Sequence, residues 1–196
     1  WPYDWSELCT SENDISGTGT EEDPYLISDL NDLVWVLNNI DSWDKYFEQT
    51  SDIDAGNTQH WDDSDDNGDG NNYNDPNDIT SDGSNQGFMP IGDGSNPFTG
   101  NYNGNHYIIE NLSSDRTSTN HIGLFGKLEN AVIEFLGISN VDLSGKNFVG
   151  AVAGQSLNSI IQGCYSSGTV LSPNHTYVGG LVGYLQGNDD NSNAIL

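Results

Sequence analysis

An acidic, asparagine-rich segment over residues 62–87 carries the side chains whose types and spacing most clearly suggest a binding site. Ca²⁺ prefers roughly six to eight oxygen ligands, and EF-hand loops supply them at alternate positions around a glycine. The segment has this pattern, with candidate ligands at Asp63, Asp65, Asn67, Asp69, Asn71 and Asp75. A register shifted by two residues, ending at Gly70, fits equally well, and Asp75 closes either one. The sequence therefore predicts a Ca²⁺ site, of modest affinity because the usual bidentate Glu is absent.

Two short patterns predict N-glycosylation. Asn111 opens the sequence Asn-Leu-Ser and Asn174 opens Asn-His-Thr, and both fit the acceptor pattern N-x-Ser/Thr. The four histidines are dispersed and show no metal-ligand spacing. We therefore expect structural or surface roles for the histidines, and a glycoprotein where the host modifies secreted chains.

The chain is strongly acidic, with 4 Lys and Arg residues against 30 Asp and Glu and a net charge of −26. Such a surface repels phosphate backbones and anionic headgroups, which excludes nucleic acid as a partner. It is typical of proteins that stay hydrated in salt, so we expect a halophilic or marine source. No window approaches the roughly 20 apolar residues of a membrane span, so we expect none in this segment.

The first residue is Trp1 rather than Met. This favours a removed leader or a start inside a longer chain. Together with the acidic surface, it favours an extracellular or cell-surface location.

From about residue 98 the sequence repeats itself. A short apolar block that closes on glycine occurs at 122–126, 150–154 and 179–183, and the closing glycines lie 28 and 29 residues apart. A second block aligns in step, with 130–134 matching 158–162. Short apolar strands between glycine corners, without a helical period, predict a β-solenoid whose coils stack on one another. A new copy begins at the end of the chain, so the coils are expected to be incomplete there.

One helix is predicted over residues 29–39. Its apolar residues Leu30, Leu33, Val34 and Leu37 follow the i, i+3, i+4, i+7 spacing of one helix face. Ser28 is the expected N-cap, with Asp29 in the first turn.

These features divide the chain into four parts. Residues 1–23 form an N-terminal segment, and 24–61 hold the capping helix and the first strands. Residues 62–87 are the acidic Ca²⁺-binding insert, and 88–196 are the coils.

Cys9 and Cys164 are the two cysteines, so the sequence permits one disulfide and requires none. In the repeat alignment Cys164 matches Leu136, and both would point inward. A free, buried thiol at Cys164 is therefore the alternative to a Cys9–Cys164 bridge.

Several motifs together resemble a known family. They are Gly17 to Ile27, Asp52-Ile53-Asp54, Pro90-Ile91-Gly92, Phe98 to Asn105, Gly123 to Gly126 and Val178 to Gly183. The chain resembles the GLUG-motif repeats of bacterial and archaeal surface proteins, which also occur beside the protease domain of IgA1-cleaving metallopeptidases. The resemblance covers most of residues 17–196 and implies a right-handed parallel β-helix. The sequence has no His-Glu-x-x-His motif and therefore no zincin site, and the loop between Trp61 and Phe88 is long for the family.

We therefore expect a secreted or cell-surface, non-catalytic β-solenoid, stiffened by Ca²⁺ and serving as an adhesin, stalk or filament subunit. Its expected partners are further copies of itself or neighbouring domains of a longer chain, with surface glycans as a candidate ligand. The alternative is a carbohydrate-active enzyme or carbohydrate-binding module, since a glycosidase needs only two carboxylates. An ice-binding solenoid is disfavoured because the aligned positions contain no threonine column.

Overall fold

The computed structural model describes residues 15–61, 86–173 and 176–187. Strands dominate this part of the chain, which confirms the expectation of an all-β protein with one α-helix. The α-helix is α1 (Leu30–Asn38), and two 3₁₀ helices follow it at Ile40–Ser42 and Gly56–His60. The strands are β1 (Tyr25–Ile27), β2 (Tyr46–Gln49), β3 (Ile53–Asp54), β4 (Asn101–Asn103), β5 (Ile108–Glu110), β6 (Ser113–Arg116), β7 (Phe125–Glu129), β8 (Val132–Glu134), β9 (Gly137–Gly145), β10 (Ala153–Leu157), β11 (Ile160–Gln162), β12 (Tyr165–Leu171) and β13 (Val182–Gln186).

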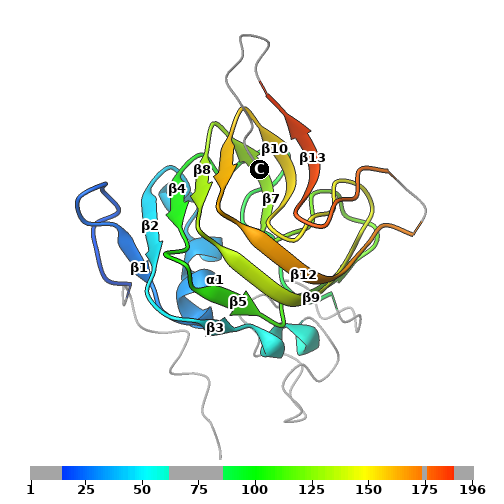
Figure 1. The fold of residues 1–196 in the computed structure, drawn as a ribbon, viewed down its shortest axis with the longest axis horizontal. Helices are drawn as coiled ribbons and strands as arrows, with labels where there is room; N and C mark the ends of the chain where they lie inside the picture. Colours follow the sequence, from blue (N-terminus) through cyan, green and yellow to red (C-terminus); the bar gives the residue numbers. More distant parts are fainter. Residues whose placement is uncertain (1–14, 62–85, 174–175, 188–196) are drawn as a thin grey trace, which may run out of the picture.

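The strands form three sheets (Figure 1). Sheet A has the order β1-β2-β4-β8-β11, sheet B the order β12-β9-β5-β3 with β6 also beside β9, and sheet C the order β13-β10-β7. All pairings between these strands are parallel. From β8 to β13 the chain visits sheets A, B and C in turn and then repeats the circuit, so each new strand pairs with the one laid down a circuit earlier.

The strand register has the same spacing as the sequence repeat. In sheet C, Phe125 of β7 pairs with Ala153 of β10, which in turn pairs with Val182 of β13. In sheet A, Val132 of β8 pairs with Ile160 of β11. These partners lie 28 or 29 residues apart, as the repeated glycines do.

The core lies between the sheets and is built from rows of aligned side chains. In sheet A the inward row consists of Phe47, Tyr102, Ile133 and Ile161, and none is more than 2% exposed. The residues on either side of each one point outward, as the period-two geometry of strands requires. Each circuit therefore buries its apolar residues against the next.

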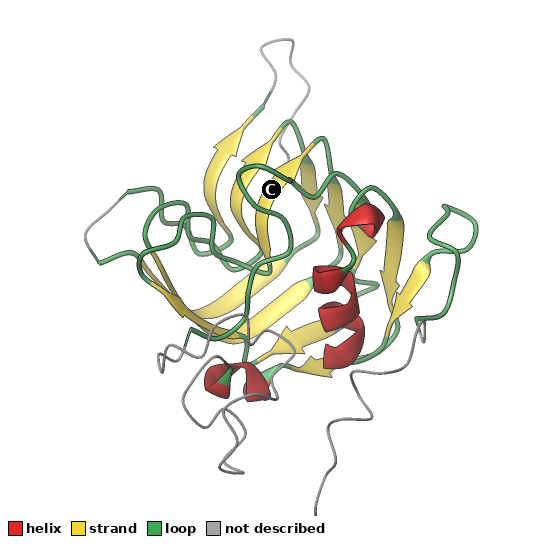
Figure 2. Cartoon of the chain, turned by 180° about the vertical axis from the view of Figure 1, so that it is seen from behind, coloured by secondary structure: helices red, strands yellow, loops and turns green. Residues whose placement is uncertain are grey.

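Helix α1 lies at the end of the molecule where β1 and β2 are found (Figures 1 and 2). It buries Leu33, Val34, Val36 and Leu37, and all but Val36 belong to the predicted apolar face of the helix. The predicted N-cap, Ser28, is wrong by one residue. Asp29 is the cap because its carboxylate accepts the N–H groups of residues 31 and 32, while Asp32 reaches back to the N–H of Asp29.

A column of glycines runs through sheet C at the positions of the sequence repeat. Gly126 follows Phe125, whose partners place Gly154 and Gly183 beside it on β10 and β13. A Cβ on Gly154 would overlap the carbonyl oxygen of Phe148. A Cβ on Gly183 would overlap the backbone nitrogen of Val149 and the carbonyl oxygen of Gly154. Glycine is therefore required here for the close approach of successive backbones.

Candidate functional site

The predicted Ca²⁺ ligands all lie outside the described residues, but the base of their segment is described. The N–H of Gly87 donates to the carbonyl of Trp61 at 3.0 Å. The rings of Trp61 and Phe88 have centroids 6.1 Å apart, and both side chains are buried. The chain therefore leaves the sheets at Trp61 and rejoins them at Gly87, next to Trp61. The segment between them is an insert whose two ends are held together.

A buried guanidinium fastens the returning end of this insert. Arg116 on β6 is 7% exposed. It donates to the Gln86 side chain at 2.9 Å, to the Gly87 carbonyl at 2.8 Å and to the Phe88 carbonyl at 3.2 Å. Bonds from a charged donor are stronger than neutral ones, so Arg116 fixes the position of this segment on sheet B.

In the described ranges, no three His, Cys, Asp or Glu side chains converge to hold a metal ion.

Cys164 packs partly buried against the core, just before β12. Its Sγ lies 3.4 Å from the Gln162 carbonyl oxygen and 3.7 Å from that of Ile133. Burial raises the pKa of the thiol, which makes it a poor nucleophile at neutral pH. Its predicted partner, Cys9, lies outside the described residues.

Asn111, one predicted glycosylation acceptor, takes part in a ladder of side chains across sheet B. Its Nδ2 donates to Oδ1 of Asp54 at 2.9 Å, and its Oδ1 accepts from the amide of Asn140 at 2.6 Å. The Asn111 bond lowers the pKa of Asp54, with a smaller contribution from the N–H of Gly56. A glycan on Asn111 would replace a hydrogen of this amide. Asn174, the other predicted acceptor, is outside the described residues.

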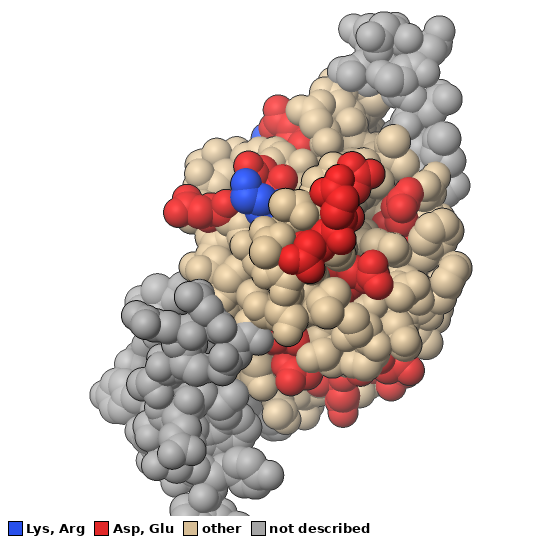
Figure 3. All heavy atoms as spheres, turned by 90° about the vertical axis from the view of Figure 1, so that its left-hand side faces the viewer, with Lys and Arg blue, Asp and Glu red and all other residues tan. Residues whose placement is uncertain are grey.

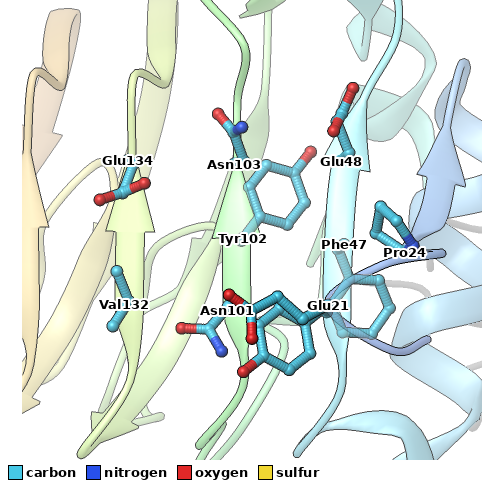
Figure 4. Close-up of a pocket in the computed structure, with 10 residues that line it drawn as sticks. Glu21, Pro24, Phe47, Glu48, Asn101, Tyr102, Asn103, Val132 and Glu134 are labelled. Carbon is cyan, nitrogen blue, oxygen red and sulfur yellow. The ribbon is translucent and has the colours of Figure 1, made fainter.

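The outer face of sheet A carries a groove that sequence reasoning did not single out. Its cavity has a volume of about 420 Å³ and is lined by Glu21, Pro24, Tyr46, Phe47, Glu48, Asn101, Tyr102, Asn103, Val132 and Glu134. Strands β2, β4 and β8 form the floor, and the loop before β1 forms a wall. Figure 4 shows Asn101 and Asn103 on β4, between Glu48 on β2 and Glu134 on β8.

The strand register explains why these polar groups meet. Tyr46, Asn101 and Val132 are direct partners on adjacent strands. Two residues further on, Glu48, Asn103 and Glu134 are partners in the same way. The intervening row, which includes Phe47 and Tyr102, faces the core. The outward rows therefore bring side chains from three separate segments onto one surface.

The groove lies on a strongly acidic molecule. Figure 3, which views the side where β1 lies, shows acidic side chains over much of that face and few basic ones. Lys45, next to Tyr46, is paired with Asp44 at 2.9 Å. None of the residues that line the groove is basic.

Among the described residues, no helix is both long and apolar enough to cross a membrane.

No protein-family profile matches the chain. It is 35% identical over 174 residues to halomucin of Haloquadratum walsbyi, which covers 86% of the chain and 2% of halomucin. It is 34% identical over 124 residues to a protein of Evansella cellulosilytica, provisionally named a Gly-rich membrane protein, covering 63% of the chain and 12% of that protein. The chain therefore spans a small part of either relative.

A crystal structure from Bacteroides ovatus has a similar fold. It belongs to a protein provisionally named an immunoglobulin A1 protease, and the TM-score is 0.56 at 18% sequence identity. The match covers 97% of this chain and 49% of the other. At this identity the likeness concerns the fold alone.

Proposed function

We propose that the chain is a non-catalytic, rigid module of a secreted or cell-surface protein of the GLUG type, built as a right-handed parallel β-helix. One observation carries the proposal: strands from successive repeats pair at offsets of 28 and 29 residues in two sheets. A fold extended by stacking suits a stalk, adhesin or filament subunit. The similarity to halomucin, a protein many times longer, supports such a role.

Ca²⁺ is proposed to stabilise the module through the acidic insert, with Asp63, Asp65, Asn67, Asp69, Asn71 and Asp75 as its ligands. The closed base at Trp61 and Gly87 supports this, because an ion bound by the insert would leave the strands on either side in place. The high net charge of −26 also favours cation binding.

Further coils are the proposed partners. In the described part, β11, β12 and β13 are the last strands of their sheets. Tyr165 and Leu171 of β12 are about half exposed, at 51% and 50%. Another coil, from neighbouring domains of a longer chain or from a second copy, would cover these side chains and pair with the strand edges.

The location is tested by antibodies raised against the 196-residue chain and applied to cells of the source organism. The proposal predicts labelling of intact cells or of the culture medium. Labelling that requires permeabilised cells would contradict it.

A further inference from the structure

We propose that the groove on the outer face of sheet A binds a neutral saccharide. A stalk with or without such a groove would be built in the same way, so saccharide binding is independent of the proposed structural role.

The size and stiffness of the groove suit a small ligand. Its volume of about 420 Å³ lies within the roughly 300–1,000 Å³ typical of ligand pockets. Its floor is formed by three strands held in parallel register. The loop that forms its wall is fixed to the floor, because the N–H of Tyr46 donates to the Gly19 carbonyl at 3.1 Å. A site held this way loses little entropy when it binds.

The chemistry of the lining matches a sugar ring. Tyr46 contributes a half-buried aromatic ring, against which the C–H face of a pyranose can pack. Asn101 and Asn103 contribute amides, each of which can donate and accept hydrogen bonds. Glu48 and Glu134 contribute acceptors for hydroxyl groups. Alternating hydroxyl donors and acceptors on a sugar can satisfy all of these groups at once.

Both amides have hydrogen-bonding groups that are free to bind a ligand. Within the part of the chain that the structure describes, the side chain of Asn101 makes no hydrogen bond. The Oδ1 of Asn103 accepts from the N–H of Asn105 at 2.9 Å, which turns its NH₂ group toward other partners. Both lie on β4, in the middle of the floor.

Other ligand classes fit the groove less well. Anions are repelled by the carboxylates of Glu21, Glu48 and Glu134, and no basic residue in the lining offsets them. A metal ion is disfavoured because these carboxylates do not converge within the described residues. A cationic amine would be attracted, but it would leave the amide donors of Asn101 and Asn103 unpaired.

The test begins with binding of the 196-residue chain to an array of neutral hexose and N-acetylhexosamine oligosaccharides, with chitosan oligomers as cationic probes. Any ligand found is then titrated by calorimetry. The proposal predicts that a neutral oligosaccharide binds, and that its affinity changes less than about twofold between about 0.1 and about 1 M NaCl, because no ion pair is formed.

Two variants locate the site. Tyr46→Ala and Asn101→Ala are each expected to weaken binding by about tenfold, since they remove the aromatic face and a central amide. Tyr165→Ala on β12 and Asn38→Ala on α1 are the matched controls, because both residues are exposed and neither lines the groove. The controls should bind as the unaltered chain does. Unchanged thermal unfolding of all four variants would exclude loss of the fold as the cause.

Three results would overturn the proposal. The first is that no neutral oligosaccharide binds. The second is that only chitosan binds and that salt abolishes the binding, which would assign the groove to amines. The third is that binding survives both Tyr46→Ala and Asn101→Ala, which would place the saccharide elsewhere.

Discussion

The rings of Phe148 and Tyr177 lie 4.9 Å apart and within 2° of parallel. They occupy equivalent turns of successive circuits, and His121 stacks on the other face of Phe148 at 4.9 Å. All three residues have positive φ, at 65°, 58° and 68° in chain order. Such backbone costs about 1–3 kcal/mol per residue and persists only where the surroundings stabilise it. The stack provides that stabilisation.

Phe148→Ala is therefore expected to lower the free energy of unfolding by about 2 kcal/mol, because the stack is lost and the strain remains. Phe148→Gly should be about 1 kcal/mol more stable than Phe148→Ala, the reverse of the usual order, since glycine accepts positive φ. Tyr165→Ala, at an exposed position, is the control. Denaturant unfolding measures all three, and an alanine variant as stable as the glycine variant would contradict the strain argument.

The glycine column predicts a sharp contrast between two glycines. A Cβ on Gly154 would collide with backbone atoms, whereas a Cβ on Gly180 would meet nothing within 4 Å. Gly154→Ala should cost about 3 kcal/mol or prevent folding, because backbone cannot move aside easily. Gly180→Ala should be neutral or stabilising by about 0.5 kcal/mol. Equal stabilities of the two variants, measured by thermal unfolding, would be inconsistent with the packing described.

The ladder through Asn111 predicts a dependence on pH. Asn111→Asp would place a carboxylate against Asp54 in place of the amide that now lowers the pKa of Asp54. The variant should be about 1 kcal/mol less stable than the unaltered chain at pH 7. A lowered pKa contributes stability above the ordinary value of about 3.9, and this contribution is lost as the pH falls below it. The difference should therefore shrink toward pH 3. Asn158→Asp controls for the added charge, because Asn158 is exposed and has positive φ, as Asn111 does. A pH-independent difference would argue against the ladder.

Ca²⁺ is expected to raise the unfolding temperature of protein stripped by a chelator. Binding only to the folded state stabilises it by about 2.7 kcal/mol at a ligand concentration of 100 Kd. Asp65→Asn and Asp69→Asn, which change predicted ligands, should weaken the effect. Asp41→Asn should leave it unchanged, because Asp41 is exposed and lies in the 3₁₀ helix beside α1, whereas the base of the insert contacts β6. Calorimetry that detects no Ca²⁺ uptake would refute the site.

The sequence predicted the all-β class and the spacing between paired strands, because its glycines repeat where backbones approach each other. Gly126, Gly154 and Gly183 mark one column, and their spacing reappears in the strand register. The helix was predicted from its apolar stripe, but its cap was misplaced because Ser28 and Asp29 are both good N-cap residues.

The groove was missed for a different reason. Tyr46 and Asn101 are strand partners, yet they are 55 residues apart because the insert lies between them. Asn101 and Val132 are partners 31 residues apart, which also differs from the later spacing of 28 or 29. Each segment alone looks like an ordinary strand with a polar outer face. Only the strand register brings the polar residues together. That register could not be predicted from a repeated motif, because the sequence repeat begins at about residue 98. The alternation of polar and apolar residues at 46–49 and 101–103 was the available signal.

A disulfide cross-link tests the pairing of successive repeats most directly. Lys127 on β7 and Gln155 on β10 are direct partners, and adjacent strands bring Cα atoms within the roughly 4.4–6.8 Å that a disulfide spans. In a chain with Cys9 and Cys164 replaced by Ser, Lys127→Cys with Gln155→Cys should therefore cross-link under mild oxidation. Glu129→Cys with Gln155→Cys, displaced by two residues, should not. Cross-linking of the displaced pair alone would contradict the 28-residue register and the proposed β-helix built on it.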